Sequence, residues 1–165
     1  MHKTGILISI LVASLVILSG CTQNGQQVQQ QTSQQNAAEI ASNCPDVTDA
    51  SAKDECYYNA AREGLDALFC AKIEASDTKE SCVLFVAKYT KEISLCSTVE
   101  SAEGRDYCYS RMAKDKYDME ICGMIRGADL RDQCYWSFAQ VKKDRKICEK
   151  MVIGEIKDYC ISSLS

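Results

Sequence analysis

The chain has 165 residues, eleven of them cysteine, and a formal net charge of −4 at pH 7. Its single histidine is His2, so Ser-His-Asp or Cys-His catalysis cannot operate in the rest of the chain. No Gly-rich phosphate loop or calcium loop is present. For this acidic chain we expect no nucleic acid partner.

Residues 1–20 predict an export signal. A short basic start, Met1-His2-Lys3-Thr4, precedes an uncharged apolar run that ends at Leu18. This run is shorter than the roughly 20 apolar residues of a transmembrane helix, and it is typical of a signal peptide. The tetrapeptide Leu18-Ser19-Gly20-Cys21 resembles the lipobox of prokaryotic lipoproteins, bacterial or archaeal.

The resemblance to lipoproteins implies cleavage before Cys21 and a lipid on the Cys21 sulfur. The protein is then exported and anchored to the outer face of the cell membrane, or to the outer membrane of a Gram-negative cell. The alternative is an ordinary signal peptide whose removal leaves Cys21 as a free thiol, which would be a liability in an exported chain.

Residues 21–39 are expected to form a flexible tether. Between Thr22 and Asn36, eight of fifteen residues are glutamine, and none is charged or aromatic. Such a segment buries too little apolar surface to offset the entropy lost on ordering. As a random coil of about 18 residues it would hold the following domain on the order of 20–25 Å from the membrane.

Residues 40–165 contain a 26-residue repeat in five copies, marked by cysteine. The gaps between successive cysteines alternate between 12 and 14 residues. A period of this size is typical of stacked-repeat architectures. The ten cysteines are Cys44, Cys56, Cys70, Cys82, Cys96, Cys108, Cys122, Cys134, Cys148 and Cys160.

Each copy is predicted to be a helical hairpin. In one long helix, steps of 12 and 14 residues would rotate successive cysteines by about 120° and −40°, so they would not share a face. Strands are disfavoured by the Ala, Glu, Lys and Asp content and by the absence of alternation. Apolar residues at spacings of three and four flank the cysteines instead, as in Phe69-Cys70 followed by Ile73.

The polar residues predict where these helices begin. An acidic residue four positions before the first cysteine is placed to start a first helix of about 9 residues: Asp66, Glu92, Asp118 and Asp144. After a turn at a small residue, a second helix of about 12 residues follows. Its expected start resembles a capping box, best seen in Ser51 with Asp54 and in Asp77 with Glu80.

The favoured role of the ten cysteines is disulfide bonding across the 12-residue step. This pairing leaves none unpaired, whereas pairing across the 14-residue step strands Cys44 and Cys160. An exported compartment permits disulfides, although the sequence does not exclude other connectivities. The alternative, a thiol-based metal-binding or redox protein of the envelope, lacks the close C-x-x-C pairs that such sites use.

We expect no enzyme activity and no cofactor. A two-carboxylate hydrolase of the envelope is a remote alternative, because carboxylates are plentiful. The acidic residues recur in register in every copy, however, and no copy departs from the others as a unique catalytic pair would require.

A basic column and one tryptophan are the candidate binding residues. The basic side chains would form either ion pairs with acidic residues of a neighbouring copy, such as Asp66 or Asp118, or a positive stripe for an anionic partner. Packing between copies is favoured for Tyr57, Tyr109 and Tyr135. The candidates are Lys53, Lys79, Arg105, Arg131, Lys157 and, as an exposed contact residue, Trp136.

The sequence therefore predicts an all-α chain, a short α-solenoid of five disulfide-stapled helical hairpins. Its cysteine-stapled helical pairs loosely resemble those of Sel1-like repeat proteins, although the period is shorter and the cysteine spacing differs, so no function carries over. Stacked repeats present extended surfaces for interaction. We expect a lipid-anchored binding or scaffold module of the cell surface that contacts a protein or another macromolecule, such as an anionic envelope component.

Overall fold

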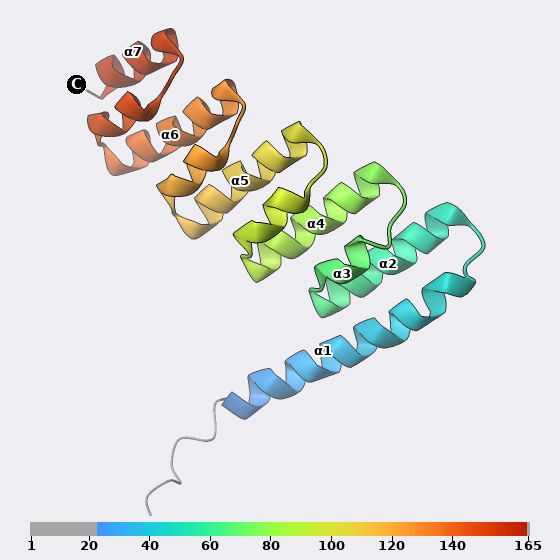
Figure 1. Ribbon diagram of the computed structural model, residues 1–165. Helices are drawn as coiled ribbons and strands as arrows, with labels where there is room; N and C mark the ends of the chain where they lie inside the picture. The colour runs from blue at the N-terminus through green and yellow to red at the C-terminus, as the bar shows by residue number, and fades with distance from the viewer. Residues whose placement is uncertain (1–22, 165) are drawn as a thin grey trace, which may run out of the picture.

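The computed structural model describes residues 23–164, so the predicted export signal and Cys21 lie outside the described part of the chain. Five long helices form the stack: α2 (Ala50–Gly64), α4 (Ser76–Thr90), α5 (Ala102–Lys116), α6 (Ala128–Lys142) and α7 (Gly154–Ser163). Figure 1 shows them side by side in chain order, with a short helix between each consecutive pair. The predicted all-α solenoid of disulfide-stapled hairpins is confirmed.

The short helices have fewer residues than the roughly 9 predicted, and most of them are 3-10 helices. They are the single-turn helix α3 (Ala67–Cys70) and three 3-10 helices, η2 (Ile93–Thr98), η3 (Met119–Met124) and η4 (Arg145–Lys150). Each packs against the long helices before and after it. The long helices α2, α4, α5 and α6 have 15 residues each, more than the expected 12. Each repeat is therefore an asymmetric hairpin, in which a helix of one or two turns packs beside a helix of about four turns.

The predicted starts of the short helices are confirmed. The side chains of Asp66, Asp118 and Asp144 each accept a hydrogen bond from the backbone N–H two residues later, at 2.8, 3.0 and 2.9 Å. Glu92 occupies the same position without a side-chain cap. These carboxylates satisfy N–H groups that have no partner inside the first turn of a helix.

The predicted capping boxes of the long helices are wrong. The N-cap residue lies two positions before the expected one, at Asp49 in α2 and at Ser101 in α5. The Asp49 and Ser101 side chains accept the N–H of Ala52 and Gly104 at 2.8 and 2.9 Å. Ser51 therefore lies inside α2. The acidic residue predicted to complete the box with it, Asp54, accepts hydrogen bonds from the next repeat instead.

The structure differs from the flexible tether expected over residues 21–39, because residues 23–43 form helix α1 (Gln23–Asn43), which leads into the 3-10 turn η1 (Cys44–Asp46). Counted in periods of 26, residues 24–38 correspond to a long helix. In later repeats the residue two positions beyond the long helix is Asp or Glu and lies at the N-cap of the next short helix, but here it is Ile40. Without that cap the helix continues, and glutamine tolerates helical conformation well.

Helix α1 packs against α2, as Figure 1 shows at the N-terminal end of the stack. Ala37 is buried at this contact. A Cβ atom added to Gly64 would lie 2.8 Å from the Cβ of Ala37, so the close approach of the two helices requires glycine at that position. Packing against α2, rather than intrinsic propensity alone, therefore orders the glutamine-rich segment.

Every full-length long helix from α2 to α6 ends at a left-handed residue other than glycine. These residues are Leu65, Lys91, Tyr117 and Lys143, with φ between 50° and 62°. This conformation turns the chain back toward the next short helix. For residues with a Cβ it costs roughly 1–2 kcal/mol.

Replacing Lys143 with glycine is expected to stabilise the protein by roughly 0.5–1 kcal/mol, because glycine adopts positive φ without strain. The free energy of unfolding in urea measures the change. The control is Gln140→Gly, an exposed position inside α6, which is expected to cost about 1 kcal/mol. A loss of stability in Lys143→Gly comparable to that of the control would contradict the argument.

Candidate functional site

Ten cysteines form five disulfide bonds across the 12-residue step, as predicted. The pairs are Cys44–Cys56, Cys70–Cys82, Cys96–Cys108, Cys122–Cys134 and Cys148–Cys160, with Cα–Cα distances of 5.4–5.8 Å. Each bond joins a short helix, or η1, to the long helix that follows it. All ten of these sulfurs are therefore engaged in S–S bonds.

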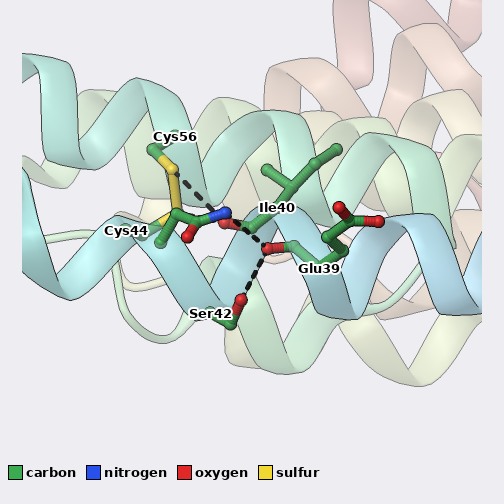
Figure 2. Close-up of a disulfide and its surroundings, with 6 residues drawn as sticks. Glu39, Ile40, Ser42, Cys44 and Cys56 are labelled. Carbon is green, nitrogen blue, oxygen red and sulfur yellow. Dashed lines mark hydrogen bonds between the residues drawn. A yellow bond between two sulfur atoms is a disulfide. The ribbon is translucent and has the colours of Figure 1, made fainter.

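The first bridge is the most accessible. Cys56 is half-buried, whereas the second cysteine of every later pair is at most 2% exposed. Figure 2 shows the Cys44 and Cys56 sulfurs beside the backbone carbonyl of Ile40, at 3.4 and 3.8 Å. Oxidised sulfur carries no hydrogen to donate, so these are packing contacts. The last turn of α1 thus covers this bridge in place of a preceding repeat.

The acidic column forms a set of junctions between repeats. Asp54, Asp106 and Asp132, here called the junction carboxylates, are buried in the long helices. Each accepts hydrogen bonds from two consecutive backbone N–H groups in the next repeat's loop, 20 and 21 residues later. The donor pairs are Glu74 and Ala75, Arg126 and Gly127, and Val152 and Ile153, at 2.7–3.1 Å.

Sequence reasoning missed this role, although a signal was present. A carboxylate recurs every 26 residues; it is aspartate in every copy except one, which has the longer glutamate Glu80. There the longer side chain accepts a hydrogen bond from the Ser101 hydroxyl at 2.6 Å. A Cβ on Gly104 would collide with the Glu80 carboxylate, so a larger residue at position 104 would displace that side chain from this junction. The column therefore aligns neighbouring repeats.

The Asp54 junction makes stability depend on pH. Hydrogen bonds from the Glu74 and Ala75 backbones hold the pKa of Asp54 below its usual value, burial opposes this effect, and Lys79 adds to it. A carboxyl group with a lowered pKa in the folded state stabilises the fold above its unfolded-state pKa of about 3.9. That contribution is lost as the pH falls through the lower folded pKa.

We therefore expect the urea midpoint to fall as the pH is lowered from about 6 to about 3, with part of the fall removed in Asp54→Asn. Parallel curves for the parent protein and Asp54→Asn would show that Asp54 does not contribute to the pH dependence.

The basic column is half-buried along the stack and only partly paired. Lys79 lies 3.5 Å from Glu100 in the next repeat. Arg105 and Lys157 donate to the backbone carbonyls of Val99 and Glu149, at 3.1 and 3.4 Å. Neither Lys53 nor Arg131 has an ion pair in the described residues, and the suggested partners Asp66 and Asp118 cap short helices instead.

The aromatic candidates are largely packed between repeats. Tyr109 and Tyr135 are each 7% exposed, and Tyr57 is half-buried. Trp136 is also half-buried, and its ring centroid lies 5.0 Å from that of Tyr159. These contacts place Trp136 in the packing between α6 and α7 with one part of its ring still accessible.

The surface contains a groove of about 1280 Å³, which sequence reasoning did not predict. One wall is α1, through side chains that include Gln29, Gln30 and Gln34. The opposite side is built by α3, α4 and η2. Of the predicted binding residues, only Lys79 lies in its lining.

The floor of this groove exposes apolar side chains that later repeats do not. Leu68 is 74% exposed, and the residues in register with it are Ser94, Glu120 and Lys146. Phe69 and Leu95 are half-buried in the groove, whereas their equivalents Ile121 and Ile147 are 3% and 4% exposed. The second repeat thus departs from the others in the column that faces the groove, a signal visible in the sequence.

The charged residues of the lining are predominantly acidic. They comprise Glu63, Asp66, Glu92 and Glu100 against the single cation Lys79, which is already paired with Glu100. Carboxylates around a partly apolar concavity give it a negative potential that favours cationic groups. The site is therefore an open groove with an apolar floor and an acidic rim.

Within residues 23–164, no cluster of three or more His, Cys, Asp or Glu side chains is arranged to hold a metal ion. Among the helices of the same range, none combines the length and the hydropathy of a membrane span.

The fold is a disulfide-stapled α-solenoid. Comparisons with known proteins give no match: neither a family model, nor a curated protein, nor a solved structure matches the chain.

Proposed function

We propose that this protein is a lipid-anchored binding module of the cell surface. The export signal and the lipobox-like Leu18-Ser19-Gly20-Cys21 support export and attachment through Cys21. The groove between α1 and the second and third repeats supports binding, and it is the observation that carries the proposal. Its floor leaves Leu68 uncovered, and contiguous exposed apolar surface in a folded protein marks interaction sites.

The other features support a rigid scaffold around this groove. Disulfide bonds fix each short helix to its long helix, and the junction carboxylates, together with Glu80, fix neighbouring repeats to one another. A site whose walls do not need to order on binding loses less entropy when the complex forms. The repeats therefore serve to hold the groove open and in a constant shape.

Site-specific photo-crosslinking in the host cell tests this proposal. A photoreactive residue replaces Leu68 in the full chain, and a matched control carries it at Val141, which is 64% exposed on α6 outside the groove. We expect a discrete cross-linked adduct from position 68 and none from position 141. Equal adducts at both positions, or none at either, would contradict a binding role for the groove.

The same cells test the anchor. The parent chain is expected in the membrane fraction with a lipid adduct detectable by intact mass, and Cys21→Ser is expected to lose both. A parent chain found only in soluble fractions would contradict the anchoring part of the proposal.

A further inference from the structure

The two most exposed leucines of the groove lie close together in sequence. Leu68 and Leu65, 74% and 41% exposed, flank the start of α3 and contribute to the lining. Residues in register with Leu65 are Lys91, Tyr117 and Lys143, so neither apolar position is imposed by the repeat. Burying an exposed leucine against a partner is favourable because it removes apolar surface from water, so these side chains favour an occupant with apolar groups.

The rim determines the charge of that occupant. Glu63, Asp66 and Glu92 have no ion pair with a cation among the described residues, and the only cation in the lining is held by Glu100. Anionic glycans, phosphate groups and acidic lipid headgroups would meet these carboxylates unfavourably. Lys or Arg side chains would meet them favourably and would gain charge-assisted hydrogen bonds.

The α1 wall favours a polypeptide over a small apolar cation. Gln29, Gln30 and Gln34 bring carboxamide groups to the lining, and each carboxamide can both donate and accept hydrogen bonds. A bound peptide backbone offers the same two functions along its length. An apolar floor, carboxamide wall and acidic rim together match apolar side chains, peptide bonds and basic side chains in one ligand.

We propose that the groove binds a polypeptide segment in which apolar residues are flanked by Lys or Arg. This inference rests on the proposed binding function and assigns the chemistry of its partner. The second repeat supplies the apolar contacts, Glu63 and Glu92 lie on either side of them in sequence, and α1 closes the groove opposite.

Peptide binding tests the inference. The full chain is placed in nanodiscs of neutral phosphatidylcholine, and fluorescence anisotropy is measured with two labelled peptides, with empty discs subtracted. One peptide has a leucine-rich centre flanked by lysines, and the other has glutamate in place of each lysine. We expect the lysine peptide to bind at least tenfold more tightly, and its affinity to fall as salt is added.

Two variants locate the binding. Leu68→Ser is expected to weaken binding of the lysine peptide about tenfold, whereas Val141→Ser leaves it unchanged. The double variant Glu63→Gln/Glu92→Gln is expected to weaken it several-fold and to reduce the dependence on salt. Its control is Glu149→Gln, an exposed carboxylate on η4 outside the lining. All of these positions are exposed on the surface, and circular dichroism verifies that each variant folds.

The inference is overturned if the two peptides bind equally, if the lysine peptide does not bind, or if Leu68→Ser behaves like Val141→Ser. Its failure is distinguishable from failure of the proposed function. A cross-link from position 68 to a carbohydrate, a lipid or a protein segment without basic residues would preserve the binding role and reject the assigned partner. A cross-link to a basic, apolar segment would support both.

Discussion

Reducing the five disulfide bonds is expected to unfold the stack at temperatures where the oxidised chain is folded. The short helices have only four or six residues, and helices of that length do not persist alone in water. Each bridge closes a loop of about 13 residues, which is worth roughly 3 kcal/mol on the chain-entropy model. Five such contributions are comparable to the whole stability of an ordinary domain.

Thermal unfolding followed by circular dichroism, with and without reductant, measures this effect. Alkylation of the denatured, unreduced chain is expected to leave all ten repeat cysteines unmodified. A free-thiol count of ten would reject the disulfide scaffold, and it would revive metal binding or redox chemistry. Unchanged melting after complete reduction would show that packing alone holds the short helices.

Removing one bridge at a time refines the test. The double variant Cys96→Ala/Cys108→Ala breaks a fully buried bridge in the middle of the stack. Cys44→Ala/Cys56→Ala breaks the half-buried bridge at its end, beside the last turn of α1. The central pair is expected to cost more, because its loss also weakens the packing of repeats on both sides.

Replacing Asp132 with alanine is expected to lower the free energy of unfolding by roughly 2–4 kcal/mol. The carboxylate is fully buried and accepts the N–H groups of Val152 and Ile153, which would lose their partner. Hydrogen bonds to a charged group are worth about 1.5–3 kcal/mol each, and an unmet buried donor adds its desolvation cost. Urea denaturation monitored by circular dichroism measures the change.

The chain contains a matched control for this prediction. Asp158 stands in register with Asp132, but it is exposed, and no hydrogen bond to its carboxylate is present among the described residues. Asp158→Ala is expected to change stability by less than about 0.5 kcal/mol. Comparable losses for both variants would show that the acidic column stabilises its own helix and not the junction between repeats.

Much of the fold could be predicted because the cysteines recur so regularly. Pairing across the 12-residue step was the only repeat-consistent scheme that left none unpaired, and it is the one observed. The starts of the short helices could also be predicted, because an Asp at the N-cap accepts a hydrogen bond from the N–H group only two residues later. The prediction of capping boxes was wrong because a carboxylate near the start of a helix can also accept hydrogen bonds from backbone N–H groups of another repeat.

The candidate site was less accessible to sequence reasoning. The basic column was predicted to bind a partner because it recurs in every copy, yet only Lys79 lies in the lining of the groove. Leu68 was not predicted, because a single apolar residue in a polar column is ordinary surface variation. Likewise, Ile40 in place of an acidic cap indicates that α1 continues unbroken, but this signal is weak until the position of the cap in the other repeats is known.

The sequence by itself determined the period and the helical class and favoured the observed cysteine pairing, because these depend on spacing along the chain and on local hydrogen bonds. Only the tertiary structure decided the junctions and the groove. The junctions join groups 20 residues apart whose meeting depends on how repeats stack. The groove lies where α1, packed along α2, faces residues of α3, α4 and η2, and the close contact of Ala37 with Gly64 is part of that packing.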